Sequence, residues 1–293
     1  MTAAPLAIFA MPKPFAGHIG VIQRNAILSW TRLTPRAEIF LFGEETGTAE
    51  IAAELQLGHL SDIQRNAFGT PLLSDLLRRA RDVTSSRLLC YVNCDIILLQ
   101  GFLDAIVRTQ ETFPQFLAVA HRWEIELTEP LAIGDDAPLR LSMLPAGAPG
   151  HHAAIDVFAF TRDMYAEVPA LALGRAWFDQ WLIKDALARQ IPVVDITRVA
   201  RAIHQKHDYA HIAGGQRGAY GGDEAQQNLE IYGGVKHACT LLDATHELLP
   251  GGAIRRVRAR RERFQVEQWL WRNFVLRTAP LRRRLGLSRS ANH

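Results

Sequence analysis

Short apolar runs alternate with segments of helical periodicity through the first 120 residues, and this alternation limits the possible folds more than any other feature. The apolar runs occupy residues 6–11, 38–42, 60–63, 87–92 and 117–120. The segments at 19–33, 48–57, 70–83 and 101–113 repeat apolar residues at the spacing of one helix face. This alternation predicts an α/β fold: a mostly parallel sheet with helices on both faces, joined by right-handed crossovers. Ligands of such sheets bind beyond the carboxyl ends of the strands.

The second half of the chain is less regular, and its elements are predicted one by one. We expect strands at 155–160 and 193–196, helices at 175–189 and 253–277, and two short helices within 224–247. Residues 1–250 are therefore expected to form a single domain, followed by an amphipathic helical tail over residues 251–293.

Charge divides the chain into an acidic body and a basic tail. Residues 251–293 contain twelve arginines against Glu262 and Glu267, and since the whole chain carries +3, residues 1–250 carry −7. No apolar stretch reaches the roughly 18 residues of a membrane-spanning helix, and the N-terminus lacks the features of a signal peptide. Three cysteines without a CxxC pair argue against disulfides and structural zinc. These features favour a cytoplasmic enzyme.

The segment YVNCDIIL, residues 91–98, places polar side chains inside an apolar run. Asp95 stands where a buried strand reaches the ligand-binding edge of the sheet. Burying a carboxylate there costs several kcal/mol unless a cation or hydrogen-bond donors compensate it. A divalent cation that bridges to a nucleotide diphosphate is one such compensation. The alternative is that Asp95 only caps the following turn.

Together with NAFGTPLLSDLLRRA at residues 66–80, this segment resembles the glycosyltransferases of the GT-A type, which use nucleotide-diphospho-sugars. Their mark is a short Asp-x-Asp signature at the end of a central strand, which Asn93-Cys94-Asp95 matches at its last position. The resemblance covers roughly residues 6–210. It implies a nucleotide-binding half over residues 1–120, an acceptor half over 121–250 and a Mn²⁺ or Mg²⁺ cofactor. The donor it implies is a UDP-sugar first, and the acceptor a hydroxyl of a glycan or of a lipid-linked molecule, in glycan or polysaccharide assembly.

The resemblance also implies the ligands of that cation. Asp95 would hold the metal, and Asn93 would contact the ribose or the metal without bringing charge. His204, in the segment HQKHDYAH, is the expected second metal ligand, with His207 and His211 as competitors.

Candidate contacts to the nucleotide follow from position along the first strands. Lysine, arginine and helix N-termini favour phosphate oxygens. The residues expected to reach base, ribose or phosphate are Ala10, Met11, Lys13, Gln23, Arg24, Arg65, Asn66, Asn93 and Asp95.

Two carboxylates are candidates for catalysis. Asp179, in GRAWFDQWL, is the expected general base for the acceptor hydroxyl, because neighbouring aromatic side chains raise a carboxyl pKa. Trp177 and Trp181 would form a wall on which the acceptor stacks. Asp156 is the alternative, suited to binding a sugar hydroxyl, and His152 is expected on the acceptor side.

Other interpretations remain open at this point. A sugar-phosphate nucleotidyltransferase needs a glycine-rich basic loop after the first strand, which MPKPFAGHIG lacks. A non-catalytic binding or scaffold protein is also compatible with Asn93. In the tail, arginines flank an aromatic segment across 254–284, a pattern typical of a helix lying on the inner face of a membrane. The alternative is packing on the domain, and no nucleic acid is expected as a partner.

Overall fold

The computed structural model describes residues 5–131, 139–207, 220–234, 238–258 and 260–270. Contacts within the chain define two units, one ending at Arg256 and one beginning at Val257. Among the described residues, no helix combines the length and the apolarity that crossing a membrane requires.

The first unit begins with the predicted alternation of strands and helices. Its elements are β1 (Ala7–Ala10), α1 (Gly17–Thr31), β2 (Glu38–Phe42), α2 (Thr48–Glu54), β3 (Gly58–Leu60), α3 (Leu73–Val83), β4 (Leu88–Val92), β5 (Ile96–Ile97), α4 (Gln100–Thr112) and β6 (Leu117–Val119). Apart from β5, these strands lie within a few residues of the predicted runs, because continuous apolar segments this short are stable only in the middle of a sheet.

The remaining elements complete the fold. They are β7 (Arg122–Ile125), η1 (Leu141–Met143), β8 (Gly147–Pro149), β9 (Val157–Thr161), α5 (Phe178–Ala188), β10 (Val193–Asp195), β11 (Ala202–Gln205), α7 (Asp223–Tyr232), η2 (Leu241–Asp243), β12 (His246–Leu248), β13 (Ile254–Arg256) and, in the second unit, α8 (Arg260–Leu270).

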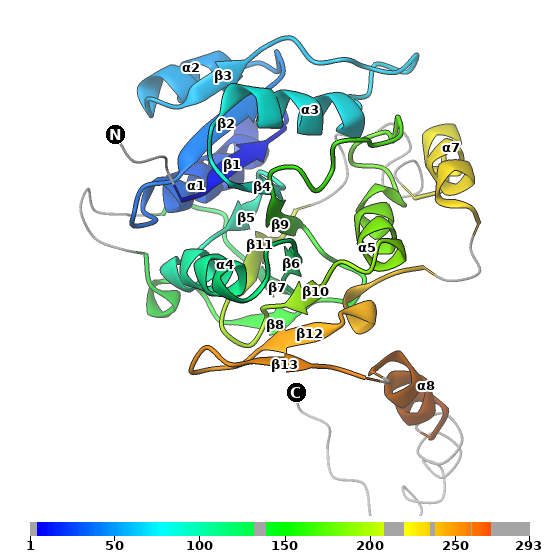
Figure 1. The fold of residues 1–293 in the computed structure, drawn as a ribbon. Coiled ribbons are helices and arrows are strands. Elements are labelled where there is room, and N and C mark those ends of the chain that lie inside the picture. The colour runs from blue at the N-terminus through cyan, green and yellow to red at the C-terminus, as the bar shows by residue number, and fades with distance from the viewer. Residues whose placement is uncertain (1–4, 132–138, 208–219, 235–237, 259, 271–293) are drawn as a thin grey trace, which may run out of the picture. The chain divides into compact units, whose positions relative to one another are not determined.

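A nine-stranded sheet in the order β13-β12-β10-β6-β9-β4-β1-β2-β3 forms the centre of the first unit (Figure 1). It is mostly parallel, as predicted; β9 runs antiparallel to its neighbours β4 and β6, and the edge strand β13 runs antiparallel to β12. A smaller sheet in the order β5-β11-β7-β8 lies beside it. Its strands β5, β7, β8 and β11 were not predicted.

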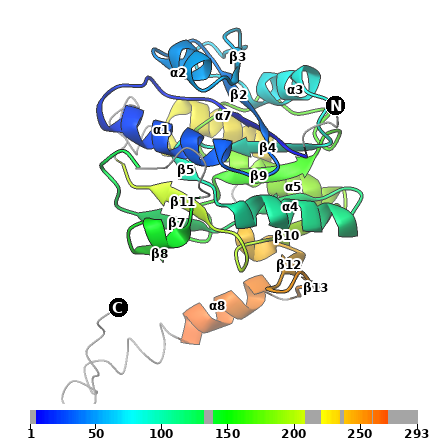
Figure 2. The same ribbon diagram turned by 90° about the vertical axis from the view of Figure 1, so that its left-hand side faces the viewer.

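Helices cover both faces of the large sheet (Figure 2). Ile8 and Ala10 of β1 belong to the core that α1, α2 and α4 cover, whereas Ala7 and Phe9 belong to the core beneath α3 and α5. This alternation along one strand places apolar side chains on both faces, which is the pattern of a sheet buried on both sides.

Two sequence predictions at the C-terminal side are wrong. Residues 224–247 form one helix, α7, a short 3₁₀ turn and strand β12 rather than two helices. The helix predicted over 253–277 begins only at Arg260, because Ile254–Arg256 pairs with β12 instead. Gly251 and Gly252, both with positive φ, form the tight turn that makes this pairing possible. The part of the predicted helix beyond Leu270 lies outside the described residues.

Asp75 holds the start of α3 to the loop after β3. Its side chain is 5% exposed, and it accepts hydrogen bonds from Gln64 N (2.9 Å), Arg79 Nε (2.7 Å) and Arg78 Nη2 (2.5 Å). Burial acts to raise the pKa of Asp75, but these three donors outweigh it and hold the pKa below its ordinary value. The ionised carboxylate therefore stabilises the fold.

Asp75→Asn is expected to lower the free energy of unfolding by about 2 kcal/mol at neutral pH, because charged hydrogen bonds are lost. A lowered pKa contributes stability above the ordinary aspartate pKa, and that contribution disappears as the pH falls through the folded pKa. Urea unfolding of both proteins at pH 7 and near pH 3 should show the difference shrinking in acid. Asp62→Asn, at an 83% exposed side chain, is the control. Equal differences at both pH values would contradict the assignment.

Candidate functional site

A cavity of about 630 Å³ opens at the carboxyl ends of β1 and β4. Its wall combines segments that are far apart in the sequence, among them residues 11–14, 93–95, 153–156 and 173–176. The cavity occupies the edge of the sheet at which the alternation of strands and helices predicts a ligand.

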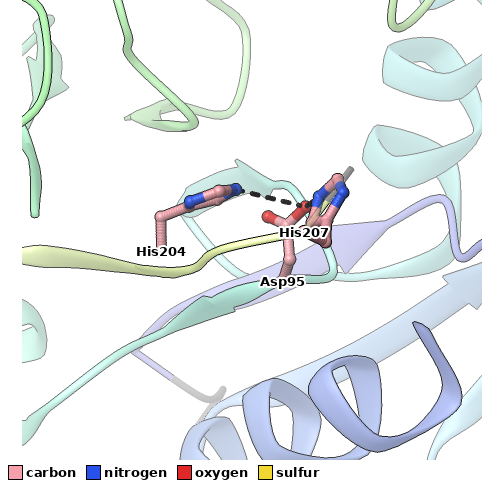
Figure 3. A group of neighbouring side chains, drawn as sticks. All are labelled: Asp95, His204 and His207. Atoms are coloured by element: carbon pink, nitrogen blue, oxygen red, sulfur yellow. Dashed lines mark hydrogen bonds and ion pairs between the residues drawn. The ribbon is translucent and has the colours of Figure 1, made fainter. Parts of the chain in front are cut away.

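Three potential metal ligands meet in this cavity, Asp95, His204 and His207 (Figure 3). Asp95 lies in the turn between β4 and β5, and antiparallel pairing places His204 of β11 opposite Ile96. The Asp95 Oδ2 atom is 2.9 Å from His207 Nε2 and 3.9 Å from His204 Nε2. One ligand atom from each residue lies within 4.8 Å of the others.

The charge state of this cluster suits a cation. Burial, and then the nearby Arg122, lower the pKa of His204 to about 3, so its imidazole is neutral at physiological pH. Burial acts to raise the pKa of Asp95, but the His207 hydrogen bond and the Lys13 ammonium, 4.0 Å from Oδ2, keep it below its ordinary value.

The second carboxylate oxygen of Asp95 gives an independent test of the fit. Asp95 Oδ1 is buried and has no hydrogen-bond partner among the described residues. A buried carboxylate oxygen without a donor is costly, and a bound cation would compensate it. One carboxylate and two imidazole nitrogens fit Mn²⁺ better than Mg²⁺, because Mg²⁺ prefers oxygen ligands.

Arg122 of β7 lies directly against this cluster. Its Nη2 atom is 2.9 Å from His204 Nδ1 and 2.7 Å from His204 Nε2, and its Nε atom is 3.5 Å from Asp156 Oδ2. A metal ion on His204 would therefore compete with this guanidinium for a ring nitrogen. Arg122 was not among the predicted site residues.

The geometry explains the asparagine at position 93. Tyr91 Oη donates to Asn93 Oδ1, and Asn93 Nδ2 donates to Asp156 Oδ1, both over 2.8 Å. An aspartate at position 93 would instead face the Asp156 carboxylate at hydrogen-bond distance. Burial raises the pKa of Asp156 to about 6, partly offset by Arg122. Asn93 thus orients Asp156 without adding a second negative charge.

Asp179 lies in the first turn of α5 and lines the same cavity. Burial, with a smaller contribution from the nearby Asp156 charge, raises its pKa to about 7, against a hydrogen bond from the Gln180 backbone that acts to lower it. Trp177, two residues before Asp179, has φ +81°, a left-handed conformation that is unusual for a large side chain. Gln180 Oε1 accepts from Trp177 N (2.9 Å) and holds this turn in place.

The structure brings part of the predicted set together. The predicted residues that line the cavity are Met11, Lys13, Gln23, Arg65, Asn93, Asp95, Asp156, Asp179, His204 and the competitor His207. They come from loops after β1, β3 and β4, from the loop before β9, and from α1, α5 and β11.

The other predicted residues are not brought to the cavity. Ala10 is 0% exposed within the core, and Arg24 is paired with Glu54 on the surface. Asn66 donates to Glu224 Oε1 (2.7 Å) and so holds its own loop to α7. The remaining three pack against other aromatic rings: Trp177 against Tyr232, Trp181 against Tyr165, and His152 against His151. His211 lies outside the described residues.

Besides Arg122, the polar residues of the cavity wall that were not predicted from the sequence include Glu45, Arg175 and Gln180. Glu45 follows β2 closely, so its position at a strand end was a usable signal. Arg175 Nε donates to Glu224 Oε2 (2.7 Å), a residue 49 positions away, and no local pattern indicates that pairing.

No protein-family model matches the chain, and no curated protein matches its sequence. Solved structures of nucleotide-diphospho-sugar transferases do match it. A protein from Desulfovibrio desulfuricans G20 assigned to that class is 9% identical over 78% of this chain and 96% of its own, with a TM-score of 0.43.

Two further matches were solved with bound UDP-GlcNAc or UDP. Staphylococcus aureus TarS 1–349 in complex with UDP-GlcNAc is 12% identical over 71% of this chain and 61% of its own, with a TM-score of 0.46. Mycobacterium tuberculosis glucosyl-3-phosphoglycerate synthase with Mg²⁺ and UDP is 14% identical over 70% and 72%, with a TM-score of 0.44. Similarity this low says nothing about activity. The evidence for an activity has to come from the residues of the cavity.

Proposed function

We propose that this protein transfers a sugar from a nucleotide-diphospho-sugar to a hydroxyl acceptor, with a divalent cation held by Asp95, His204 and His207. The observation that carries the proposal is the cluster itself: a buried carboxylate with one unsatisfied oxygen and two histidines, at the ligand-binding edge of the sheet. The cation would neutralise charge on the departing diphosphate. Lys13, 4.0 Å from Asp95, adds a second positive group for phosphate oxygens.

Asp179 and Asp156 have different roles in the proposed reaction, proton transfer and sugar binding. Asp179, with a pKa of about 7, takes the proton of the acceptor hydroxyl while that oxygen bonds to the sugar and the bond to the diphosphate breaks. The bonding electrons leave with the diphosphate. Asp156 is held by Asn93, and its Oδ2 atom accepts no hydrogen bond among the described residues, although Arg122 Nε lies 3.5 Å away; this atom is therefore suited to bind a sugar hydroxyl.

Glu45 supports a UDP-sugar or a GDP-sugar as donor over a CDP-sugar or an ADP-sugar. Its Oε1 atom accepts from Arg65 Nη2 (2.8 Å), while Oε2 is buried with no donor among the described residues. A carboxylate only accepts hydrogen bonds. Uracil and guanine present a ring N–H, whereas cytosine and adenine present a ring acceptor at the corresponding position.

Glu45→Gln is therefore expected to weaken UDP binding by roughly tenfold and to reduce the preference for UDP over CDP. A buried acceptor strongly disfavours a base that has no N–H to pair with it. Calorimetric titration with UDP, GDP, CDP and ADP in the presence of Mn²⁺ measures both effects. Glu44→Gln, at the neighbouring exposed residue, is the matched control. Unchanged UDP and CDP affinities in Glu45→Gln would remove this assignment.

The function is tested by incubating the full chain with a panel of nucleotide sugars and Mn²⁺ and following release of the nucleoside diphosphate. We expect slow hydrolysis of one UDP- or GDP-sugar that stops when EDTA is added. Nucleotide binding without any turnover would favour a non-catalytic binding protein. Pyrophosphate release from UTP and a sugar 1-phosphate would favour a nucleotidyltransferase. The absence of both nucleotide binding and turnover would refute the proposal.

For the C-terminal segment we propose contact with anionic lipid, which fits a lipid-linked acceptor. In the second unit, Arg258 and Arg263 are exposed, and Val266 of α8 is 55% exposed. Cations beside apolar side chains are what an interfacial helix needs. The full chain should co-sediment with phosphatidylserine vesicles at low salt, and reversing the charge of these two arginines should abolish this. Equal sedimentation of both proteins would contradict it.

A further inference from the structure

Two buried carboxamides lie behind the metal-ligand cluster and outside the cavity wall. Asn25 of α1 is 1% exposed, and Gln205 of β11 is 0% exposed. A buried carboxamide is costly unless its donors and acceptors are paired, so its partners indicate what it holds in place. Gln205 directly follows His204, and its partners include the backbone of Asp95.

Gln205 ties the Asp95 backbone to the strand that carries His204. Its backbone N donates to Asp95 O over 3.3 Å, and its side-chain Nε2 donates to the same carbonyl over 3.2 Å. The Nε2 atom also donates to Ile22 O of α1 over 2.7 Å. Two donors of one residue thus converge on the backbone of a metal ligand, and the third contact anchors them to a helix.

Asn25 fixes which way the Gln205 carboxamide points. Asn25 Nδ2 donates to Gln205 Oε1 over 3.0 Å, so the Nε2 group of Gln205 must face the carbonyls of Asp95 and Ile22. Asn25 cannot turn over either, because its Oδ1 atom accepts from Leu131 N (2.8 Å) and its Nδ2 atom also donates to Glu129 O (3.0 Å). Each carboxamide therefore has one orientation.

The same helix holds the turn after Asp95 at two further points. Trp30 Nε1 donates to Ile96 O over 2.8 Å, and Ser29 Oγ accepts from Leu98 N over 3.0 Å. With the bridge through Gln205, α1 contacts the backbone at residues 95, 96 and 98. Only the Gln205 contact also includes the strand of His204.

We propose that Gln205 is a positioning residue for the metal ligands, and that Asn25 is the partner that orients it. Together they fix the separation between the Asp95 carboxylate and the imidazoles of His204 and His207. This inference rests on the proposed function for the identity of the bound metal. Ligand sets bind a metal well only when the residues behind them lock the geometry.

The test is the Mn²⁺ affinity of Gln205→Met, measured by calorimetric titration with Mn²⁺ alone and without nucleotide. Methionine keeps the length and the burial but removes both the NH₂ donor and the carbonyl acceptor of the carboxamide, and we expect the affinity to fall by roughly ten- to a hundredfold. Asn25→Leu should lower the affinity in the same direction, since it frees the Gln205 carboxamide to rotate.

Asn228→Leu is the matched control for a purely structural effect. Asn228 is also 1% exposed, and its carboxamide bonds to the backbone of Ala172 and Ala176, away from the metal ligands. We expect it to lower the melting temperature about as much as Asn25→Leu and to leave Mn²⁺ affinity unchanged. The proposal would be overturned if Gln205→Met bound Mn²⁺ as tightly as the wild type, or if Asn228→Leu lost as much Mn²⁺ affinity as Gln205→Met.

A crystal structure of metal-free Gln205→Met separates this inference from the proposed function. The expected result is loss of the 2.9 Å contact between Asp95 Oδ2 and His207 Nε2. If that contact is retained, the positioning role is wrong even where the wild type binds Mn²⁺. If the contact is lost and the wild type binds no Mn²⁺, the positioning role stands and the metal assignment fails.

Discussion

Asp179→Asn is expected to lower the turnover of the nucleotide-sugar donor by roughly a thousandfold while UDP and Mn²⁺ still bind, since removing a general base has an effect of that order. The wild-type rate should rise with pH and level off above about 7, where Asp179 is ionised. The variant should show no such rise. Stopped assays of diphosphate release across the pH range measure both.

The same variant has an expected effect on stability. Because the folded pKa of Asp179 is raised, ionisation opposes folding, and stability is lost as the pH rises from the ordinary aspartate value through about 7. Asp179→Asn should therefore melt higher than the wild type at pH 8 and equally near pH 4. Asp185→Asn, on the same helix but paired with Arg189, is the control and should keep full turnover. A variant at position 179 that retains a tenth of the activity would exclude Asp179 as the base.

Asp95→Asn is expected to lower the Mn²⁺ affinity by at least roughly a hundredfold, because Asp95 supplies the one carboxylate among the three candidate ligands. UDP affinity measured with Mn²⁺ should then fall to its metal-free value. Asp156→Asn is the matched control, since it removes a second carboxylate of the same cavity that contacts Arg122 and Asn93. We expect it to change Mn²⁺ affinity by no more than a few fold. Comparable losses of Mn²⁺ affinity in both variants would show that the total charge of the cavity, and not ligation by Asp95, determines Mn²⁺ binding.

Much of the large sheet could be predicted because its strands are short apolar runs that need no partner to be recognised. The strands of the smaller sheet could not. Segments such as RWEI in β7 and AIHQ in β11 carry polar side chains, and pairing between residues some 80 positions apart defines them. For this reason His204 could be proposed only from a resemblance, and Arg122 was missed.

The two tryptophans show where a residue pattern is ambiguous. Trp177 and Trp181 stand four residues apart, a spacing that fits a sugar-binding wall and a helix face packed on the core equally well. The structure has them against Tyr232 and Tyr165. At Ile254–Arg256 an apparent helix start became a strand because a Gly-Gly turn and the edge of β12 were available. That turn was the one local signal against a helix.

The most direct test of a metal-anchored nucleotide site is calorimetric titration of the wild-type chain with UDP, once with saturating Mn²⁺ and once in EDTA. We predict that Mn²⁺ raises UDP affinity at least roughly tenfold, and that UDP raises Mn²⁺ affinity by the same factor, as linkage requires. Equal UDP affinity in the two titrations would contradict the central claim that Asp95, His204 and His207 bind a cation that holds the diphosphate.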